Sequence, residues 1–112
     1  MAGQTFPKAN RLRRRPEFVA AQQYERRRKR EGLIFLLRPN PVAVTRLGIT
    51  VTRRSQPLAV RRNRARRLLR EAFRLNYGLL PQGWDLLVIV TKEALGLTLP
   101  QAGKAILWAM GR

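Results

Sequence analysis

The chain has 112 residues, of which 24 are Lys or Arg and only 6 are Asp or Glu, so its formal net charge is +18. This length suits one domain with a modest core, and a hydrophobic content of 45% excludes a wholly disordered chain. The absence of cysteine excludes a disulfide framework and a thiolate zinc site, the apolar runs are too short to span a membrane, and the cytoplasm is the expected compartment.

The N-terminal part of the chain is predicted to be a flexible leader over residues 1–9, followed by a single domain over residues 10–112. A basic segment opens the domain, and Pro16 suits the first turn of a short helix that runs towards Tyr24. Residues 26–30 form a second basic cluster. We expect this cluster to be a solvated helix end or a loop, and it could also contact a phosphate group.

Three segments are predicted to be strands. Residues 33–37 are a short apolar run bounded by glycine and proline. Residues 47–52 alternate strictly between apolar and small or polar side chains, which places Leu47, Ile49 and Val51 on a core face. Residues 84–91 are apolar on both faces at their centre, which fits a buried strand covered by helices on one side.

Residues 58–77 are predicted to form a long amphipathic helix. Seven of the fourteen residues from 61 to 74 are arginine. Its apolar face, expected in the core, comprises Ala65, Leu68, Leu69, Ala72 and Phe73. Its opposite face comprises Asn63, Arg66, Arg67, Arg70 and Arg74. Gly78 is predicted to end the helix, and Pro81 to prevent it from resuming.

The last helix is predicted from a capping box, in which Thr98 is the N-cap and Gln101 lies three residues on. Its apolar face comprises Ala102, Ala105, Ile106, Ala109 and Met110, and Gly111 ends it. The predicted order of elements is therefore α-β-β-(β)-α-β-α. This order indicates a small two-layer α+β sandwich without a second domain.

The sequence offers little chemistry of its own. It has no histidine and no cysteine, so the commonest general base and the thiol nucleophile are missing, and no tight cluster of acids resembles a metal site. Glu71 lies within the arginine-rich part of the helix over residues 58–77, where an ion pair with Arg67 or Arg74 is expected. These features favour a protein that binds nucleic acid and leaves any catalysis to its partner.

The helix over residues 58–77 bears on whether the nucleic acid is RNA or DNA. Its polar face is almost entirely arginine, which suits phosphates and the shape of RNA better than it suits base reading in the DNA major groove. A structural ribosomal or other RNA-packaging protein and a DNA-binding module remain alternatives. Phe18, Phe35, Trp84 and Tyr24 could stack on bases, although a core position is favoured for each.

The residues 62–64, Arg-Asn-Arg, together with residues 66–73, resemble the RNR signature of the bacterial ribonuclease P protein component. The strand over residues 47–52 with its following basic pair, and Glu17-Phe18 near the start, are also similar to that family. The resemblance implies a subunit of an RNA-based endonuclease that removes the 5′ leader from precursor tRNA, with Mg²⁺ held mainly by the RNA subunit and the substrate. It also implies a left-handed β-α-β crossover, which the general rule would not predict.

The resemblance further implies two sets of contacts. The residues expected to bind the RNA subunit are Arg61, Arg62, Asn63, Arg64, Arg66, Arg67, Arg70 and Arg74. The residues expected to bind the leader of precursor tRNA are Arg11, Arg13, Phe18, Thr50, Thr52, Arg53 and Arg54. No metal-binding or catalytic residue is expected in the protein, and neither a membrane nor an obligate protein partner is predicted. Gln22 replaces a second aromatic of the family, and the loop over residues 55–58 lacks its usual glycine.

Overall fold

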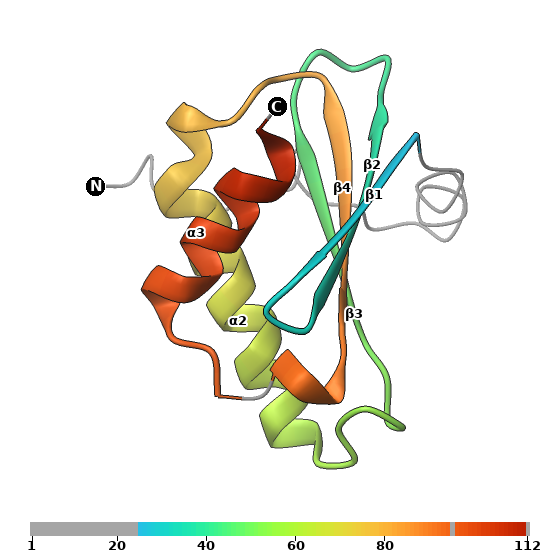
Figure 1. Cartoon of the computed structure of the whole chain (residues 1–112), viewed down its shortest axis with the longest axis vertical. Coiled ribbons are helices and arrows are strands. Elements are labelled where there is room, and N and C mark those ends of the chain that lie inside the picture. The colour runs from blue at the N-terminus through green and yellow to red at the C-terminus, as the bar shows by residue number, and fades with distance from the viewer. Residues whose placement is uncertain (1–24, 95, 112) are drawn as a thin grey trace.

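The computed structural model describes residues 25–94 and 96–111 (Figure 1). Its elements, in chain order, are β1 (Arg26–Arg30), β2 (Leu33–Pro39), β3 (Arg46–Val51), α2 (Ala59–Asn76), the 3₁₀ helix η3 (Tyr77–Leu79), β4 (Trp84–Val90), the 3₁₀ helix η4 (Lys92–Ala94) and α3 (Leu99–Met110). The predicted leader and first helix lie outside the described residues, as do Arg11, Arg13, Phe18 and Gln22. Each of the strands and helices predicted after residue 32 is present.

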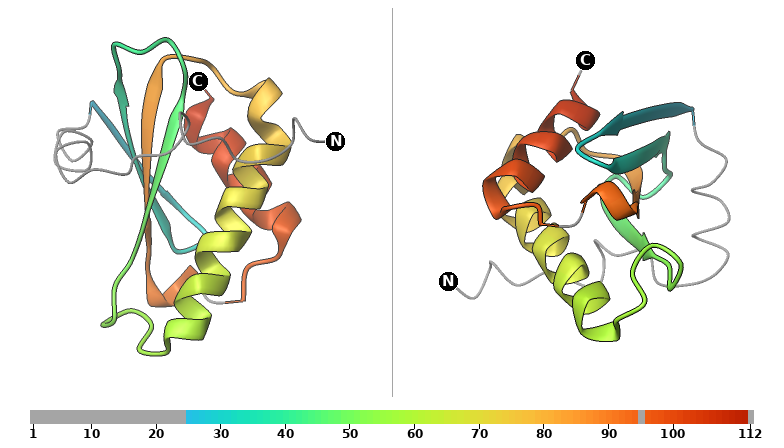
Figure 2. Two further views of the ribbon diagram at one scale, coloured as in Figure 1. Left: turned by 180° about the vertical axis from the view of Figure 1, so that it is seen from behind. Right: turned by 60° about the horizontal axis from the view of Figure 1, so that its bottom comes forward.

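The four strands form one sheet in the order β1-β2-β4-β3. Strand β2 pairs antiparallel with β1 and with β4, whereas β3 and β4 run parallel. Parallel neighbours require a crossover connection, and α2 provides it. Helices α2 and α3 pack against each other on one face of the sheet, as Figures 1 and 2 show. The predicted two-layer α+β sandwich is confirmed, with three strands before α2, while the handedness of the crossover stays a prediction.

The main core lies between the sheet and the two helices. On β2 and β4, alternate residues point into it, because side chains of a strand alternate between its faces. They include Phe35 and Val88, which are fully buried. From α2, the core receives Leu69, Ala72 and Phe73, and from α3 it receives Ala102, Ala105, Ile106, Ala109 and Met110. The apolar faces predicted for both helices are therefore confirmed.

A second, smaller apolar cluster lies on the sheet face that points away from α2 and α3. Leu36 of β2 and Leu87 of β4 are buried there, and Ile34 and Ile89 pack against them. Thr50 of β3 pairs with Ile89, so it belongs to this same face. The double-sided apolar character of residues 84–91 thus has a direct explanation, because β4 is a central strand with apolar neighbours on both faces.

The prediction for residues 26–30 is wrong, because this basic cluster is the edge strand β1 and neither a helix end nor a loop. A tight turn through Glu31 and Gly32, which have φ angles of 57° and 74°, pairs β1 with β2. A Cβ atom on Gly32 would lie 2.4 Å from the backbone nitrogen of Ala94, so only glycine fits there. An exposed edge strand made of cations resists pairing with other chains.

The helix ends differ slightly from the prediction. Helix α2 ends at Asn76 and continues as η3, so Gly78 lies inside a 3₁₀ turn and is not among the glycines with positive φ. At the start of α3, Thr98 and Gln101 form the predicted capping box, and Gly111 is the C-cap. Helices α2 and α3 approach closely, because a Cβ on Gly103 would lie 2.8 Å from Nδ2 of Asn76.

Candidate nucleic-acid interface

The polar surface of α2 is a dense array of guanidinium groups. Arg61, Asn63, Arg64 and Arg67 are exposed, while Arg62, Arg66, Arg70 and Arg74 are half-buried along the edges of the helix. The first turn contains no acidic residue, and the N-cap residue Leu58 makes no side-chain hydrogen bond to the helix. The positive end of the helix dipole therefore adds to the charge of the arginines, which makes this end of α2 suited to phosphate groups.

Two of the predicted residues interact with each other at the exposed surface. Arg66 donates from Nη1 to Oδ1 of Asn63 over 3.2 Å. This contact turns the guanidinium of Arg66 towards the N-terminal half of α2. Asn63 therefore orients a neighbouring cation in addition to presenting its own amide.

Arg74 forms an ion pair with Glu71, one of the two partners predicted for that carboxylate. The hydrogen bond from Arg74 lowers the pKa of Glu71 below its ordinary value, and the same contact raises the pKa of Arg74. The charge of Arg74 is thus partly neutralised within the protein. Arg74 is therefore the predicted RNA-binding residue least suited to bind a phosphate.

Arg62 has a structural contact that the sequence did not indicate. Its Nη1 donates to the backbone carbonyls of Gln56, at 3.0 Å, and of Pro57, at 2.8 Å. The guanidinium therefore fixes the loop that leads into α2. In this structure, Arg62 holds the local geometry at the start of the helix.

The predicted leader-binding residues fall into two groups where the structure describes them. Thr50 is half-buried on the sheet face away from the helices. Thr52 lies in the turn after β3, where its Oγ1 is 2.6 Å from Oγ of Ser55 and accepts from the Ser55 backbone nitrogen. Arg53 and Arg54 are exposed in the same turn. The turn places these two cations between the end of β3 and the start of α2.

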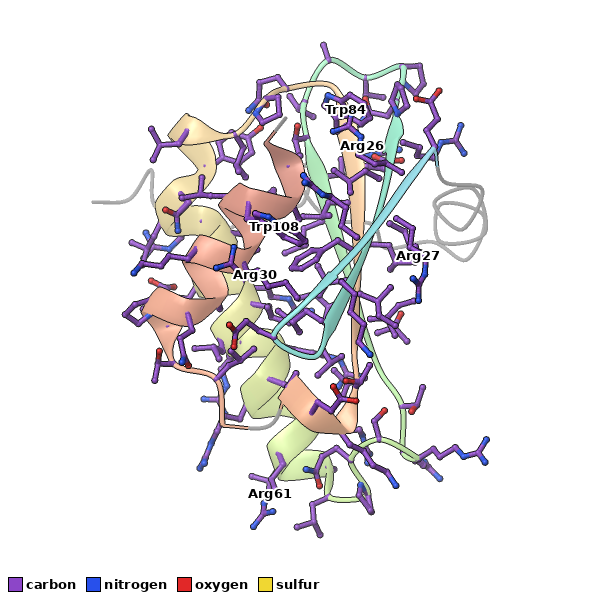
Figure 3. The ribbon with its side chains drawn as sticks, in the orientation of Figure 1. Arg26, Arg27, Arg30, Arg61, Trp84 and Trp108 are labelled. Carbon is purple, nitrogen blue, oxygen red and sulfur yellow. The ribbon has the colours of Figure 1, made fainter. Side chains whose placement is uncertain are left out.

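Sequence reasoning missed a set of arginine–tryptophan contacts that β1 makes with α3 and with β4. The guanidinium carbons of Arg28 and Arg30 lie 4.4 and 5.4 Å from the ring centre of Trp108, and that of Arg26 lies 5.6 Å from the ring centre of Trp84. Figure 3 shows Arg26 and Arg30 on the helix side of β1 and Arg27 on the opposite side. The signal was the alternation of residues 26, 28 and 30, but an unbroken basic run conceals a period of two.

Arg28 also donates from Nη1 to the backbone carbonyls of Trp108, at 2.8 Å, of Ala109, at 3.3 Å, and of Gly111, at 3.1 Å. These carbonyls belong to the last turn of α3, whose acceptors have no partner within the helix. The basic cluster of β1 therefore stabilises the C-terminus of α3, in agreement with the sign of the helix dipole.

Other kinds of site find no support in the described parts of the chain. Residues 25–94 and 96–111 contain no group of three or more acidic, His or Cys side chains placed to hold a metal ion. Within those same ranges, no helix has the length and apolar character needed to cross a membrane. The arginine face of α2 is thus the strongest candidate site.

Known proteins are similar to this chain in sequence and in fold. The family model described as ribonuclease P matches residues 6–112. The ribonuclease P protein component of Thermotoga maritima is 37% identical over 90 residues, which cover 80% of this chain and 76% of that protein. The corresponding protein of Citrifermentans bemidjiense is 36% identical over 112 residues, covering 100% of this chain and 95% of that one.

Solved structures of ribonuclease P proteins have the same fold as this chain. The ribonuclease P protein of Thermotoga maritima superposes with a TM-score of 0.77 at 33% identity, covering 89% of this chain and 94% of that chain. The ribonuclease P protein of Staphylococcus aureus has the same fold, with a TM-score of 0.77 at 23% identity and coverage of 91% and 93%. From the family match over residues 6–112, the identity to these relatives and the arginine-lined helix between two parallel strands, this chain belongs to the ribonuclease P protein component family.

Proposed function

We propose that this chain acts as the protein subunit of ribonuclease P and binds the RNA subunit through the polar face of α2. The observation that carries the proposal is the exposed array of Arg61, Arg64 and Arg67 at a helix whose first turn has no acid. Guanidinium groups fit phosphate oxygens bidentately, and the helix N-terminus favours anions. Arg66 and Arg70 extend the same surface towards the middle of the helix.

We infer that the 5′ leader of precursor tRNA binds on the sheet face opposite the helices. Thr50, which is half-buried on that face, supports this placement, since a single-stranded leader can lie along the surface of a sheet. Thr52, Arg53 and Arg54 would bind leader phosphates at the end of β3. Family resemblance adds Arg11, Arg13 and Phe18 to the proposed set.

We further propose that the hydrolysis belongs to the RNA subunit, with Mg²⁺ held mainly by that RNA and by the substrate. The chain has no histidine or cysteine to act as a general base or nucleophile. Among the acids of the described ranges, Glu71, Asp85 and Glu93 form ion pairs with basic side chains. The protein would therefore contribute charge and substrate positioning. A precursor-tRNA substrate would place this complex in the cytoplasm.

A reconstitution tests the proposed function. The full chain is mixed with a bacterial ribonuclease P RNA and a precursor tRNA at low Mg²⁺ concentration, where the RNA alone cleaves slowly. We expect faster removal of the 5′ leader with the protein than without it, and a smaller gain when Arg66 and Arg67 are both replaced by alanine. Cleavage at the rate of the RNA alone would remove the proposal.

A further inference from the structure

A pocket of about 370 Å³ lies between the N-terminal half of α2 and the segment that connects η4 to α3. Its lining combines exposed cations with a less exposed apolar surface, and consists of Gln56, Arg61, Arg64, Ala65, Leu68, Ala94, Gly96 and Leu97. Arg61 and Arg64 lie three residues apart, so their side chains project from one side of the helix. Figure 3 places Arg61 at the end of α2 far from the Arg26–Trp84 contact.

Gln56 is the unusual member of this lining, because its side chain is polar although the residue is only 4% exposed. Its backbone nitrogen donates to the Thr52 carbonyl at 3.0 Å, and its own carbonyl accepts from Arg62. Its side-chain Oε1 accepts from the backbone nitrogen of Leu58 at 3.2 Å. These three hydrogen bonds hold Gln56 in one position in the pocket wall.

The remaining group of this side chain is the Nε2 donor. The amide orientation is determined, because only Oε1 can accept the hydrogen bond from Leu58. Nε2 has no acceptor among residues 25–94 and 96–111. A buried donor without an acceptor is costly, so such a group is expected to meet an acceptor of a ligand. Gln56 therefore supplies, in the wall of the pocket, a buried hydrogen-bond donor without a protein acceptor in the described ranges.

Building on the proposed function, we infer that this pocket binds one unpaired nucleotide of the ribonuclease P RNA. The flat base packs on Ala65, Leu68 and Leu97, and an acceptor on its edge, a carbonyl oxygen or ring nitrogen, takes the hydrogen bond from Nε2 of Gln56. The attached phosphate binds Arg61 and Arg64. Unstacked bases of RNA are the parts that proteins recognise by their edges, whereas the arginines by themselves read only the backbone.

This assignment gives the loop over residues 55–58 a role in recognition. Arg62 fixes the loop through the Gln56 and Pro57 carbonyls, and the loop in turn presents the Gln56 amide to the pocket. Arg62 is thus a positioning residue for Gln56. The two neighbouring arginines, Arg61 and Arg64, have no side-chain partner within the described ranges and remain available to a phosphate.

The test uses two variants of the full chain. Gln56→Glu retains the acceptor for Leu58 but replaces the Nε2 donor with an oxygen, and Ala65→Leu fills the pocket without changing the charge. Gln101→Glu is the charge-matched control, because Gln101 lies outside this pocket and Glu is equally suited to a capping box. Equilibrium affinity for the ribonuclease P RNA is measured, together with chemical probing of the base edges and thermal melts.

We expect both pocket variants to weaken RNA binding about tenfold, because Gln56→Glu removes one hydrogen bond to a buried partner and Ala65→Leu excludes the base from the pocket. Gln101→Glu should bind as the wild type does. One nucleotide should be protected from edge-specific modification by the wild-type protein and reactive again with both variants. If Gln56→Glu fails to fold, Ala65→Leu decides the question.

Wild-type affinity and unchanged protection in the folded variants would overturn the pocket assignment. The variant Arg66→Ala separates this outcome from a failure of the proposed function. If Arg66→Ala weakens RNA binding and the pocket variants do not, the α2 interface is supported and the nucleotide pocket is rejected. If all three bind the RNA with wild-type affinity, the proposed function itself fails.

Discussion

Asp85 is a buried carboxylate whose two oxygens are both occupied by hydrogen-bond donors. Its Oδ1 accepts from Nε of Arg46 at 2.8 Å and from Nδ2 of Asn40 at 2.9 Å, and its Oδ2 accepts from Nη2 of Arg46 at 2.9 Å. The side chains of Asp85 and Arg46 are 3% and 16% exposed. This bidentate pair joins β4 to β3 across the parallel ladder, so it belongs to the fold and not to the RNA interface.

Breaking this pair should destabilise the protein strongly. We expect Asp85→Ala to lower the free energy of unfolding by about 3–5 kcal/mol, because it leaves the Arg46 charge buried without its partner. Urea unfolding measures the loss. The control is Glu93→Ala, which removes an exposed 3.9 Å pair with Lys29 and should cost less than about 1 kcal/mol. Equal losses for the two variants would contradict this account.

At the scale of elements, β1 and α3 depend on each other. Arg28 reaches from the edge strand to three carbonyls at the C-terminus of α3 and lies over the Trp108 ring. A helix end needs partners for its last carbonyls, and a guanidinium can bond several at once while stacking on an aromatic ring. The edge strand therefore contributes to the helical layer as well as to the sheet.

Arg28→Ala should reduce the free energy of unfolding by about 1.5–3 kcal/mol, the range for hydrogen bonds to a charged group. Arg27→Ala is the matched control, because Arg27 lies on the opposite side of the same strand, and it should change stability by less than about 0.5 kcal/mol (Figure 3). Arg28→Lys should restore only part of the loss, since lysine lacks the planar fork. A stability loss from Arg27→Ala as large as that from Arg28→Ala would mean that the α3 contact is unimportant.

The apolar face of α2 carries a third prediction. Leu69 is 2% exposed within the main core, so Leu69→Ala should cost about 2–5 kcal/mol through lost burial and the cavity it leaves. Leu75→Ala on the same helix is the control, because Leu75 is 52% exposed and should cost far less. Denaturant unfolding of both variants compares them. A loss below about 0.5 kcal/mol for Leu69→Ala would contradict the orientation of α2.

At the scale of the whole molecule, a net charge of +18 makes association with any polyanion favourable. Charge alone does not distinguish one RNA from another, and its effect is screened by salt. Specific contacts on α2 must therefore be separated from this general attraction. The salt dependence of binding makes the separation, because each phosphate contact releases condensed counterions.

We expect Arg66→Ala to weaken binding of the ribonuclease P RNA and to reduce the salt slope by about one unit, the effect of one lost phosphate contact. Asn63→Ala should weaken binding with little change in slope, because Asn63 is uncharged and orients Arg66. Lys104→Ala, an exposed cation on α3, removes the same charge elsewhere and should leave the slope unchanged. If Arg66→Ala and Lys104→Ala behave alike, the α2 face has no specific role.

The sequence by itself determined the elements whose signal is local. The strand around Ile49 was predictable from its alternation, the strands around Phe35 and Val88 from short apolar runs that follow a glycine, and the capping box at Thr98 because a cap needs only local residues. The arginine face of α2 was predictable as well, because apolar residues at helical spacing identify the core-facing side of the helix and leave the cations on the opposite side.

The tertiary structure alone decided the partners of the cations. Residues 26–30 became an edge strand because β2 offered a pairing edge and because α3, which lies far away in the sequence, offered carbonyls to Arg28. The same holds for the Arg46–Asp85 pair and for the pocket around Gln56. The sequence does not distinguish a basic side chain that binds a carbonyl from one that binds a carboxylate, a tryptophan or a phosphate, because long-range packing selects its partner.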